Sequence, residues 1–139
     1  AMICSTGINK ATVLGDDFYI YYKQEWNPLF NDVYGHYVSG FYGDYLFHSV
    51  PYEDASADTL ETEEFNKLGD EGSLGCVRME TADVKWIYDN CVLGTTVIIT
   101  AKAEKGPFDK PTAYKLASWH TWDPTDPNMY YKCKQRGCH

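Results

Sequence analysis

Residues 72–79 read Gly-Ser-Leu-Gly-Cys-Val-Arg-Met and place one cysteine, Cys76, directly behind a segment of small residues. Small residues before a cysteine let a substrate and backbone N–H groups approach its sulfur, as a nucleophilic cysteine requires. A buried structural cysteine that follows a turn would produce the same local pattern. The stretch therefore indicates either a nucleophile or a core cysteine, and the rest of the chain must distinguish them.

A nucleophilic cysteine needs a base, and His48 is the strongest candidate. It follows the apolar residues 45–47 and precedes a serine and, at 51, a proline, so a strand ends where its imidazole would enter a cleft. There it could accept the thiol proton. Taken by itself, a histidine at this position is more often a hydrogen-bonded core residue than a base. The weaker candidates are His36, His120 and His139.

Composition restricts the class of protein. The 139 residues correspond to one domain, and 44% hydrophobic residues with twelve tyrosines favour a β-rich globular fold. A formal net charge of −8, without a local cluster of lysine and arginine, disfavours nucleic acid as a partner. The sequence contains no apolar run long enough to span a bilayer, and no signal-peptide pattern opens it.

The hydrophobic pattern predicts short strands and one helix. Strands are expected over 18–22 and 97–100, and a hairpin over 34–49 with its turn near Gly40 and Gly43. Apolar residues at helical spacing from Val84 to Cys91 predict a helix that Thr81 caps, Gly94 ends and Cys91 helps to bury. The acidic segment 51–72 is expected to be a long surface loop, with a helical turn over 62–68, that forms a lid or side wall of a cleft.

Five cysteines leave at least one unpaired. Cys133 and Cys138 lie close together in a short polar tail, where a disulfide would hold an end that otherwise frays. A zinc site made of Cys133, Cys138, His139 and His120 is the alternative, but the spacing fits no standard zinc motif well. The sequence therefore predicts the disulfide and no metal.

The cysteine and histidine motifs belong to an ordered series that resembles the catalytic domain of the L,D-transpeptidases, the YkuD-like family. Residues 4–7 (Cys-Ser-Thr-Gly) and 12–15 (Thr-Val-Leu-Gly) look like its STG and TPxG elements, with valine where proline is usual. Phe-His-Ser at 47–49 matches its first histidine motif. Residues 73–79 match its SHGC(V/I)R(L/M) signature except at Leu74, and 83–99 match its helix and closing strand.

The resemblance covers residues 3–100 and implies a mainly β fold, a two-sheet β-sandwich with a catalytic cleft and one short helix near the cysteine. It implies that Cys76 is the nucleophile, His48 the general base and Ser49 the neighbour whose backbone orients the imidazole. The N–H groups of Gly75 and Cys76 would stabilise an oxyanion. The residues expected on the substrate side are Ser73, Leu74 and Arg78, the last as a structural or substrate-orienting cation.

The chemistry implied by the resemblance is cross-linking of peptidoglycan. The cysteine attacks the carbonyl of the third, L-configured diamino acid of a tetrapeptide stem and expels D-alanine, and the amine of a second stem resolves the thioester to a 3-3 cross-link. Resolution by water would make an L,D-carboxypeptidase. The implied partners are peptidoglycan stem peptides and carbapenem inhibitors, outside the membrane in the cell wall, in the periplasm or secreted. No cofactor is implied.

Three departures qualify the resemblance. Leu74 replaces the signature histidine, segment 49–72 between the two motifs is longer than usual, and no strand precedes residues 4–7. We therefore expect residues 1–139 to be a single catalytic domain that lacks the first strand, with any membrane anchor or wall-binding region outside this chain. Leu74 also favours an alternative, a non-catalytic wall-binding or scaffold domain. Papain-like and NlpC-type hydrolases place the nucleophile before the base, an order that disfavours them here.

Overall fold

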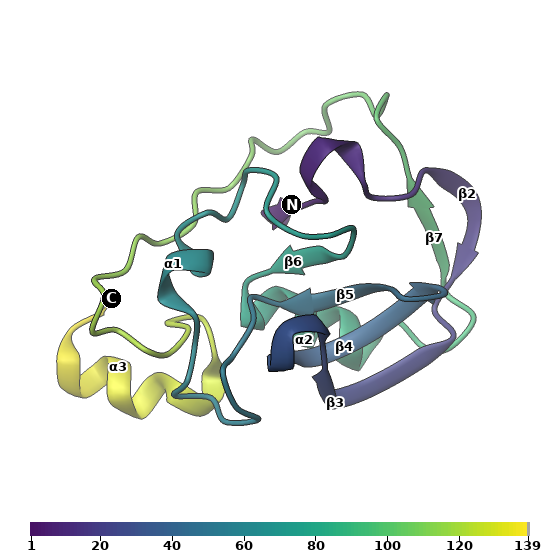
Figure 1. Ribbon diagram of the computed structural model, residues 1–139. Coiled ribbons are helices and arrows are strands. Elements are labelled where there is room, and N and C mark those ends of the chain that lie inside the picture. The colour runs from purple at the N-terminus through teal and green to yellow at the C-terminus, as the bar shows by residue number, and fades with distance from the viewer. Residues whose placement is uncertain (139) are drawn as a thin grey trace.

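The computed structural model describes residues 1–138 and places the strands in two β-sheets (Figure 1). The larger sheet has the order β1-β6-β5-β4-β3, and the smaller one pairs β2 with β7. Neighbouring strands are antiparallel except for β5 and β6, which are parallel. The strands are β1 (Cys4–Ser5), β2 (Gly15–Tyr19), β3 (Tyr22–Pro28), β4 (Tyr34–Tyr42), β5 (Tyr45–Ser49), β6 (Val77–Met79) and β7 (Thr96–Ile99).

The helices of the described residues are short. The α-helices are α1 (Thr62–Phe65), α2 (Thr81–Asn90) and α3 (Tyr130–Arg136), and the 3-10 turns are η1 (Ile8–Lys10), η2 (Phe30–Asp32) and η3 (Pro127–Met129). The chain is thus mainly β with two sheets, as the sequence predicts, and α2 is the predicted helix. No helix of residues 1–138 is long and apolar enough to cross a membrane.

Apolar side chains fasten the small sheet to the large one. Phe18 of β2 and Val97 of β7 are buried in one cluster with Phe41 of β4 and Val77 of β6. The rings of Phe18 and Phe41 lie 5.9 Å apart. Burial of each such side chain contributes about 1.5–3 kcal/mol, so this cluster accounts for the packing of the two sheets.

The predicted strand over 18–22 is wrong, because the chain changes sheets within it. Phe18 belongs to β2 and Tyr22 to β3. Between them, the Ile20 N–H donates to the Thr95 carbonyl (2.9 Å) and the Tyr21 N–H to the Gly40 carbonyl (3.0 Å). The residues of this aromatic run are suited to strands of either sheet, so the sequence does not indicate where the chain passes from one sheet to the other. The predicted hairpin is confirmed as β4 and β5.

The tail, not Thr81, caps α2. Helix α2 begins at Thr81, and the preceding residue makes no side-chain capping bond. Instead, the Asp123 carboxylate accepts the Thr81 N–H at 2.7 Å, and the Thr125 hydroxyl accepts the Ala82 N–H at 3.1 Å. The predicted local cap was wrong because a group more than forty residues downstream in the sequence satisfies the first N–H groups of this helix.

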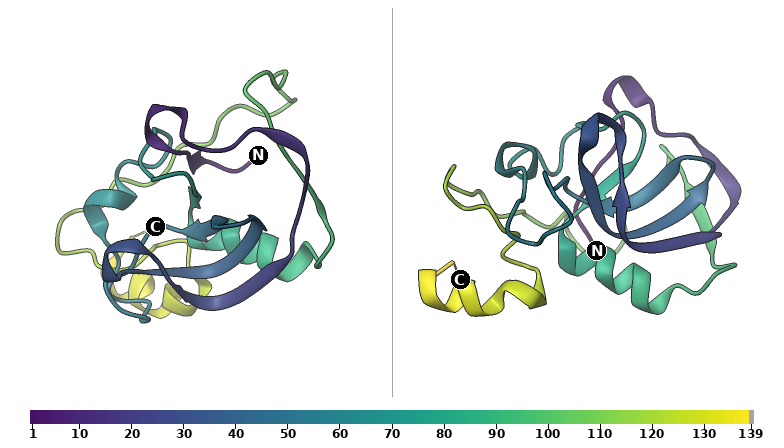
Figure 2. Two further views of the ribbon diagram at one scale, coloured as in Figure 1. Left: turned by 45° about the vertical axis from the view of Figure 1, so that its right-hand side comes forward. Right: turned by 60° about the horizontal axis from the view of Figure 1, so that its bottom comes forward.

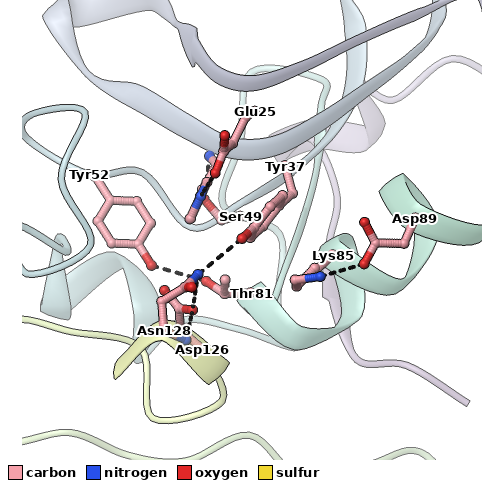
Figure 3. A network of polar contacts seen from close by, with 10 residues as sticks. Glu25, Tyr37, Ser49, Tyr52, Thr81, Lys85, Asp89, Asp126 and Asn128 are labelled. Atoms are coloured by element: carbon pink, nitrogen blue, oxygen red, sulfur yellow. Dashed lines mark hydrogen bonds and ion pairs between the residues drawn. The ribbon is translucent and has the colours of Figure 1, made fainter. Parts of the chain in front are cut away.

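A partly buried polar network continues this connection between the tail and the body (Figure 3). The Tyr52 and Thr81 hydroxyls are 3.0 Å apart, and the Asn128 amide donates to the Tyr37 hydroxyl and to the Asp126 carboxylate, each at 3.0 Å. These side chains come from β4, from segment 51–72, from α2 and from η3. Residues 123–128 are therefore part of the packed structure.

Segment 51–72 contributes core residues, so its prediction as a surface loop is wrong. Tyr52, Leu60, Phe65 and Leu68 are buried in a second hydrophobic cluster, which also holds Ile3 and Ala113. Tyr52 and Phe65 are fully buried. The acidic composition of the segment concealed these apolar residues, which pack with one another and with residues of the N-terminus and the tail.

The C-terminal helix α3 lies at the opposite end of the molecule from the β2–β7 sheet (Figure 2). Its Cys133 is buried beside Trp122 and Met129 in a third cluster, and Cys138 packs against it. All five cysteines lie in the described residues and are free thiols, so the predicted disulfide is not formed in this structure. His139, part of the alternative zinc prediction, lies outside the described residues.

Candidate active site

A cleft of about 310 Å³ lies against the start of β6 and the end of β5. The β3–β4 connection over residues 29–33 and segment 51–72 form its other walls. The residues predicted from the sequence that line it are His48, Ser73, Leu74, Cys76 and Arg78. Thus two motifs that are distant in the sequence meet in one cavity, because the parallel pair of β5 and β6 sets His48 opposite Arg78.

His48 is held in one orientation. Its side chain is buried, and its Nδ1 lies 2.5 Å from the carbonyl oxygen of Ser49. A carbonyl only accepts, so Nδ1 carries the hydrogen and Nε2 keeps its lone pair. Burial lowers the pKa of His48 to about 4; the Ser49 carbonyl opposes this shift and the Arg78 charge adds to it. At neutral pH the imidazole is therefore uncharged and able to accept a proton at Nε2.

Cys76 lies immediately before β6 with its thiol hydrogen-bonded. The thiol donates to the Asp44 carbonyl at 3.3 Å. Burial raises the pKa of Cys76, the Asp44 charge raises it further, and a backbone hydrogen bond from Leu46 and the Arg78 charge lower it. In the resting state the cysteine is thus a thiol in the same cleft as a neutral imidazole, and proton transfer must accompany any attack by sulfur.

The backbone before Cys76 requires glycine. Gly75 has φ +149°, and a Cβ there would lie 2.9 Å from Cε1 of Tyr45. Its carbonyl accepts the Thr12 hydroxyl at 2.8 Å, and the Thr12 oxygen accepts the Gly7 N–H at 2.7 Å. The two N-terminal motifs at 4–7 and 12–15 therefore hold the cysteine loop, a role that sequence reasoning did not assign to them.

The predicted oxyanion donor at Gly75 already has a partner. The Gly75 N–H donates to the Ser73 hydroxyl oxygen at 3.1 Å, and that hydroxyl donates to the Cys76 carbonyl at 2.5 Å. The chain bends over residues 74–76 instead of continuing as a strand. Leu74, 72% exposed, therefore stands at the rim of the cleft.

Charged groups of both signs line the cleft. The Arg78 guanidinium donates to Glu64 at 2.8 Å, and Glu64 also contacts Lys67 at 2.6 Å. Burial alone would raise the pKa of Glu64, but Lys67 and Arg78 together lower it. Burial, assisted by the charge of Glu64, raises the pKa of Glu61. Sequence reasoning missed Glu61 and Glu64, since nothing local shows that their segment borders the cysteine.

Residues 1–99 match the family model described as the YkuD L,D-transpeptidase catalytic domain. Over 60 residues the chain is 42% identical to the putative L,D-transpeptidase YciB of Bacillus subtilis (strain 168). These matched residues make up 42% of this chain and 29% of YciB.

Solved structures show the same fold. An L,D-transpeptidase from Mycobacterium smegmatis aligns with TM-score 0.55 at 21% identity, over 72% of this chain and 48% of that one. The LD transpeptidase LdtMt1 in complex with imipenem aligns with TM-score 0.56 at 17% identity, over 71% and 48%. The chain thus spans less than half the length of these relatives. With the family model matched over most of its length, the chain belongs to the YkuD family of L,D-transpeptidase catalytic domains.

Proposed function

We propose that this domain is a cysteine-dependent L,D-transpeptidase that forms 3-3 cross-links between peptidoglycan stem peptides, with Cys76 as nucleophile and His48 as general base. One observation carries the proposal: the Cys76 thiol and an imidazole whose Nε2 is an acceptor line the same cleft of a family member. The substrate lies outside the cytoplasmic membrane, so the proposal includes an extracytoplasmic location.

The first half of the reaction forms a thioester. His48 Nε2 removes the thiol proton as the Cys76 sulfur attacks the carbonyl carbon of the third residue of the stem. The carbon–nitrogen bond to D-alanine then breaks, and the imidazolium returns the proton to the leaving amine. The Cys76 N–H is the predicted oxyanion donor that remains, and the Gly75 N–H can join it only after releasing the Ser73 hydroxyl.

The second half transfers the acyl group to an amine. The neutral side-chain amine of the acceptor stem attacks the thioester carbon and gives a proton to His48. The carbon–sulfur bond then breaks, and His48 passes that proton to the Cys76 sulfur, which restores the thiol. In its protonated form this amine is a cation, and Glu61 and Glu64 on the cleft wall provide the opposite charge that attracts it. Glu64 is already paired with Arg78 and Lys67, so we expect Glu61 to provide most of the attraction for this amine.

A second candidate, a non-catalytic scaffold domain, is favoured by two features. The raised pKa of Cys76 and the occupied Gly75 N–H describe a site that is not fully prepared for attack. Reaction with a carbapenem separates the candidates, because a related structure is a complex with imipenem. The protein should be incubated with imipenem and its intact mass measured, followed by peptide mapping.

We expect one covalent adduct, located on Cys76 and missing in Cys76→Ala. An adduct on another cysteine, or the same adduct in Cys76→Ala, would remove Cys76 from the proposal, and an inert wild type would support the scaffold. A synthetic tetrapeptide stem, supplied with and without an acceptor amine, then distinguishes cross-linking from hydrolysis by water.

The role of His48 is tested in the same reaction. His48→Ala should slow acylation by roughly two to four orders of magnitude, the usual range for loss of a general base. Because the pKa of His48 is about 4, the wild-type rate should fall with acid only near that pH and not near 6.5. A rate in His48→Ala close to that of the wild type would exclude His48 as the base.

A further inference from the structure

A second cluster of reactive side chains lies at the end of the molecule that carries α3. His120, Cys133 and Cys138 each offer one ligand atom, and these atoms all lie within 4.8 Å of one another. The Cys138 sulfur is 3.9 Å from Nε2 of His120. None of the three lines the cleft described above, so the proposed reaction does not account for their meeting.

The end of α3 explains why the two cysteines meet. Gly137 adopts the left-handed conformation, and its N–H donates to the Cys133 carbonyl at 2.8 Å. The Cys138 N–H donates to the same carbonyl at 3.3 Å. This glycine-terminated reversal folds the residue after the glycine back over the last helical turn. It therefore sets the Cys138 side chain beside that of Cys133.

His120 reaches the cysteines from a separate segment and is fixed on both its backbone and its ring. Its carbonyl accepts the Thr62 hydroxyl at 2.6 Å, and its N–H donates to the Ala117 carbonyl at 2.9 Å. The imidazole packs against two aromatic rings, with centroids 4.0 Å from Trp122 and 5.4 Å from Trp119. Its position is thus set by the fold and does not depend on the cysteines.

Two sulfurs and one imidazole nitrogen are donors that zinc prefers. Zinc binds sulfur at about 2.3 Å and nitrogen at about 2.0–2.1 Å in a tetrahedron, so its ligand atoms lie roughly 3.3–3.8 Å apart. The separations here exceed that range by about 1 Å at most. We propose that His120, Cys133 and Cys138 form a structural zinc site, with a fourth position for water or another donor.

The surroundings of Cys133 fit a metal-bound thiolate. The Trp122 indole N–H donates to the Cys133 sulfur at 3.2 Å, and such an outer hydrogen bond stabilises a ligating thiolate. Two thiolates and a neutral imidazole balance the charge of Zn²⁺, so Lys132, Lys134 and Arg136 of α3 are no obstacle to binding. Zinc would use all three side chains, whereas a disulfide would join only the two cysteines.

The site would connect α3 to the segment that caps α2. Trp122 is adjacent to Asp123, whose carboxylate accepts the first N–H of α2, and His120 is bonded to Thr62 of α1. Metal binding to the folded state alone raises its stability. Zinc should therefore raise the melting temperature of the protein, whatever the activity of the cleft.

The experiment uses the Cys76→Ala protein, so that the cleft thiol does not bind metal, purified under reducing conditions. We expect about one zinc per chain by elemental analysis. Replacement by Co²⁺ should give the intense visible bands of a tetrahedral site and near-ultraviolet charge-transfer bands from thiolate. Chelation should lower the melting temperature, and added zinc should restore it.

Variants assign the ligands. Cys133→Ser, Cys138→Ser and His120→Gln should each weaken Co²⁺ binding at least tenfold, whereas Cys91→Ser, at another half-buried cysteine, should bind as the parent does. Because Cys138 is only half-buried, Cys138→Ser should fold normally, and its loss of Co²⁺ binding can therefore be assigned to the missing ligand. The proposal is overturned if His120→Gln binds Co²⁺ like the parent. It is also overturned if the protein, refolded with zinc, contains no metal and a mapped Cys133–Cys138 disulfide.

Discussion

The backbone at Gly75 is the strictest local requirement of the cleft. Its φ of +149° excludes other residues on conformational grounds, and the ring of Tyr45 excludes them on steric grounds. The Thr12 hydroxyl also holds the Gly75 carbonyl, so the loop cannot rotate freely to relieve a clash. Three independent constraints thus act on the peptide that directly precedes the cysteine.

Gly75→Ala should therefore displace the cysteine loop. We expect imipenem acylation to slow by at least about tenfold and the free energy of unfolding to fall by about 1–3 kcal/mol, the magnitude of local backbone strain. Gly72→Ala is the matched control, because a Cβ there meets only the Arg78 guanidinium at 3.7 Å. Stopped-flow acylation and urea denaturation measure both effects. Equal behaviour of the two variants would show that the conformation of Gly75 is not required.

Leu74 tests whether the missing signature histidine matters. Its side chain is 72% exposed at the rim of the cleft, while the proposed proton acceptor is His48 on β5. We expect Leu74→His to change the acylation rate by about tenfold or less, equivalent to roughly 1.4 kcal/mol. The two proteins should be compared at matched pH. An inert wild type that Leu74→His activates would favour the scaffold function instead.

Motifs located the residues of the candidate site, but not their hydrogen bonds. His48, Cys76 and Arg78 line one cleft, as the ordered series of motifs led us to expect. The bond from the Gly75 N–H to the Ser73 hydroxyl depends on a bend that residue identities alone do not determine. A pattern of residue types thus predicts which side chains lie close together, but not which of their polar atoms already form hydrogen bonds.

At the scale of elements, segment 51–72 has two faces. Its apolar residues pack into the second cluster, whereas Pro51, Glu61 and Glu64 line the cleft. The segment is therefore a side wall fixed by its own core. Replacing the whole segment with a flexible linker should unfold the protein, in contrast to the surface loop that its composition indicated.

A pair of substitutions in α1 tests this division. Phe65→Ala should lower the free energy of unfolding by about 3–5 kcal/mol, because Phe65 is fully buried. Glu63→Ala, on the exposed side of the same helix, should change it by less than about 0.5 kcal/mol. Both variants are measured by urea denaturation at neutral pH. A loss below about 1 kcal/mol for Phe65→Ala would mean that the segment is a loosely attached loop.

The elements that could be predicted from sequence are those determined by neighbours along the chain. The hairpin of β4 and β5 and the body of α2 follow from local alternation and helical spacing. The division of 18–22 between two sheets and the capping of α2 by Asp123 involve partners far away in sequence. Partners that are distant in the sequence leave no periodic pattern, so an analysis of local periodicity misses both the sheet crossing and the cap.

At the scale of the whole molecule, buried histidines and carboxyl groups have opposing effects on pH dependence. Burial lowers the pKa values of His36 and His48 to about 4, so between pH 4 and 6.5 the unfolded chain binds more protons and stability rises with pH. Burial, assisted by Asp123 and Asp83, raises the pKa of Glu80 from 4.5 to about 7. Between pH 4.5 and about 7 the folded state therefore binds the extra proton at Glu80, and this residue makes stability fall as the pH rises.

Glu80→Gln should separate these opposing contributions. Glutamine cannot ionise, so the variant avoids the cost that wild-type Glu80 incurs between pH 4.5 and about 7, where the unfolded chain has released this proton and the folded protein still holds it. Relative to wild type, we expect its free energy of unfolding to increase by about 1–3 kcal/mol between pH 4.5 and pH 8, with most of the gain complete by pH 7. Urea denaturation across this range measures the difference, and Glu63→Gln removes the same charge from an exposed site as control. Parallel curves for wild type and Glu80→Gln would show that Glu80 ionises equally easily in the folded and unfolded states, and the acidic start of α2 would then have no part in the pH dependence of folding.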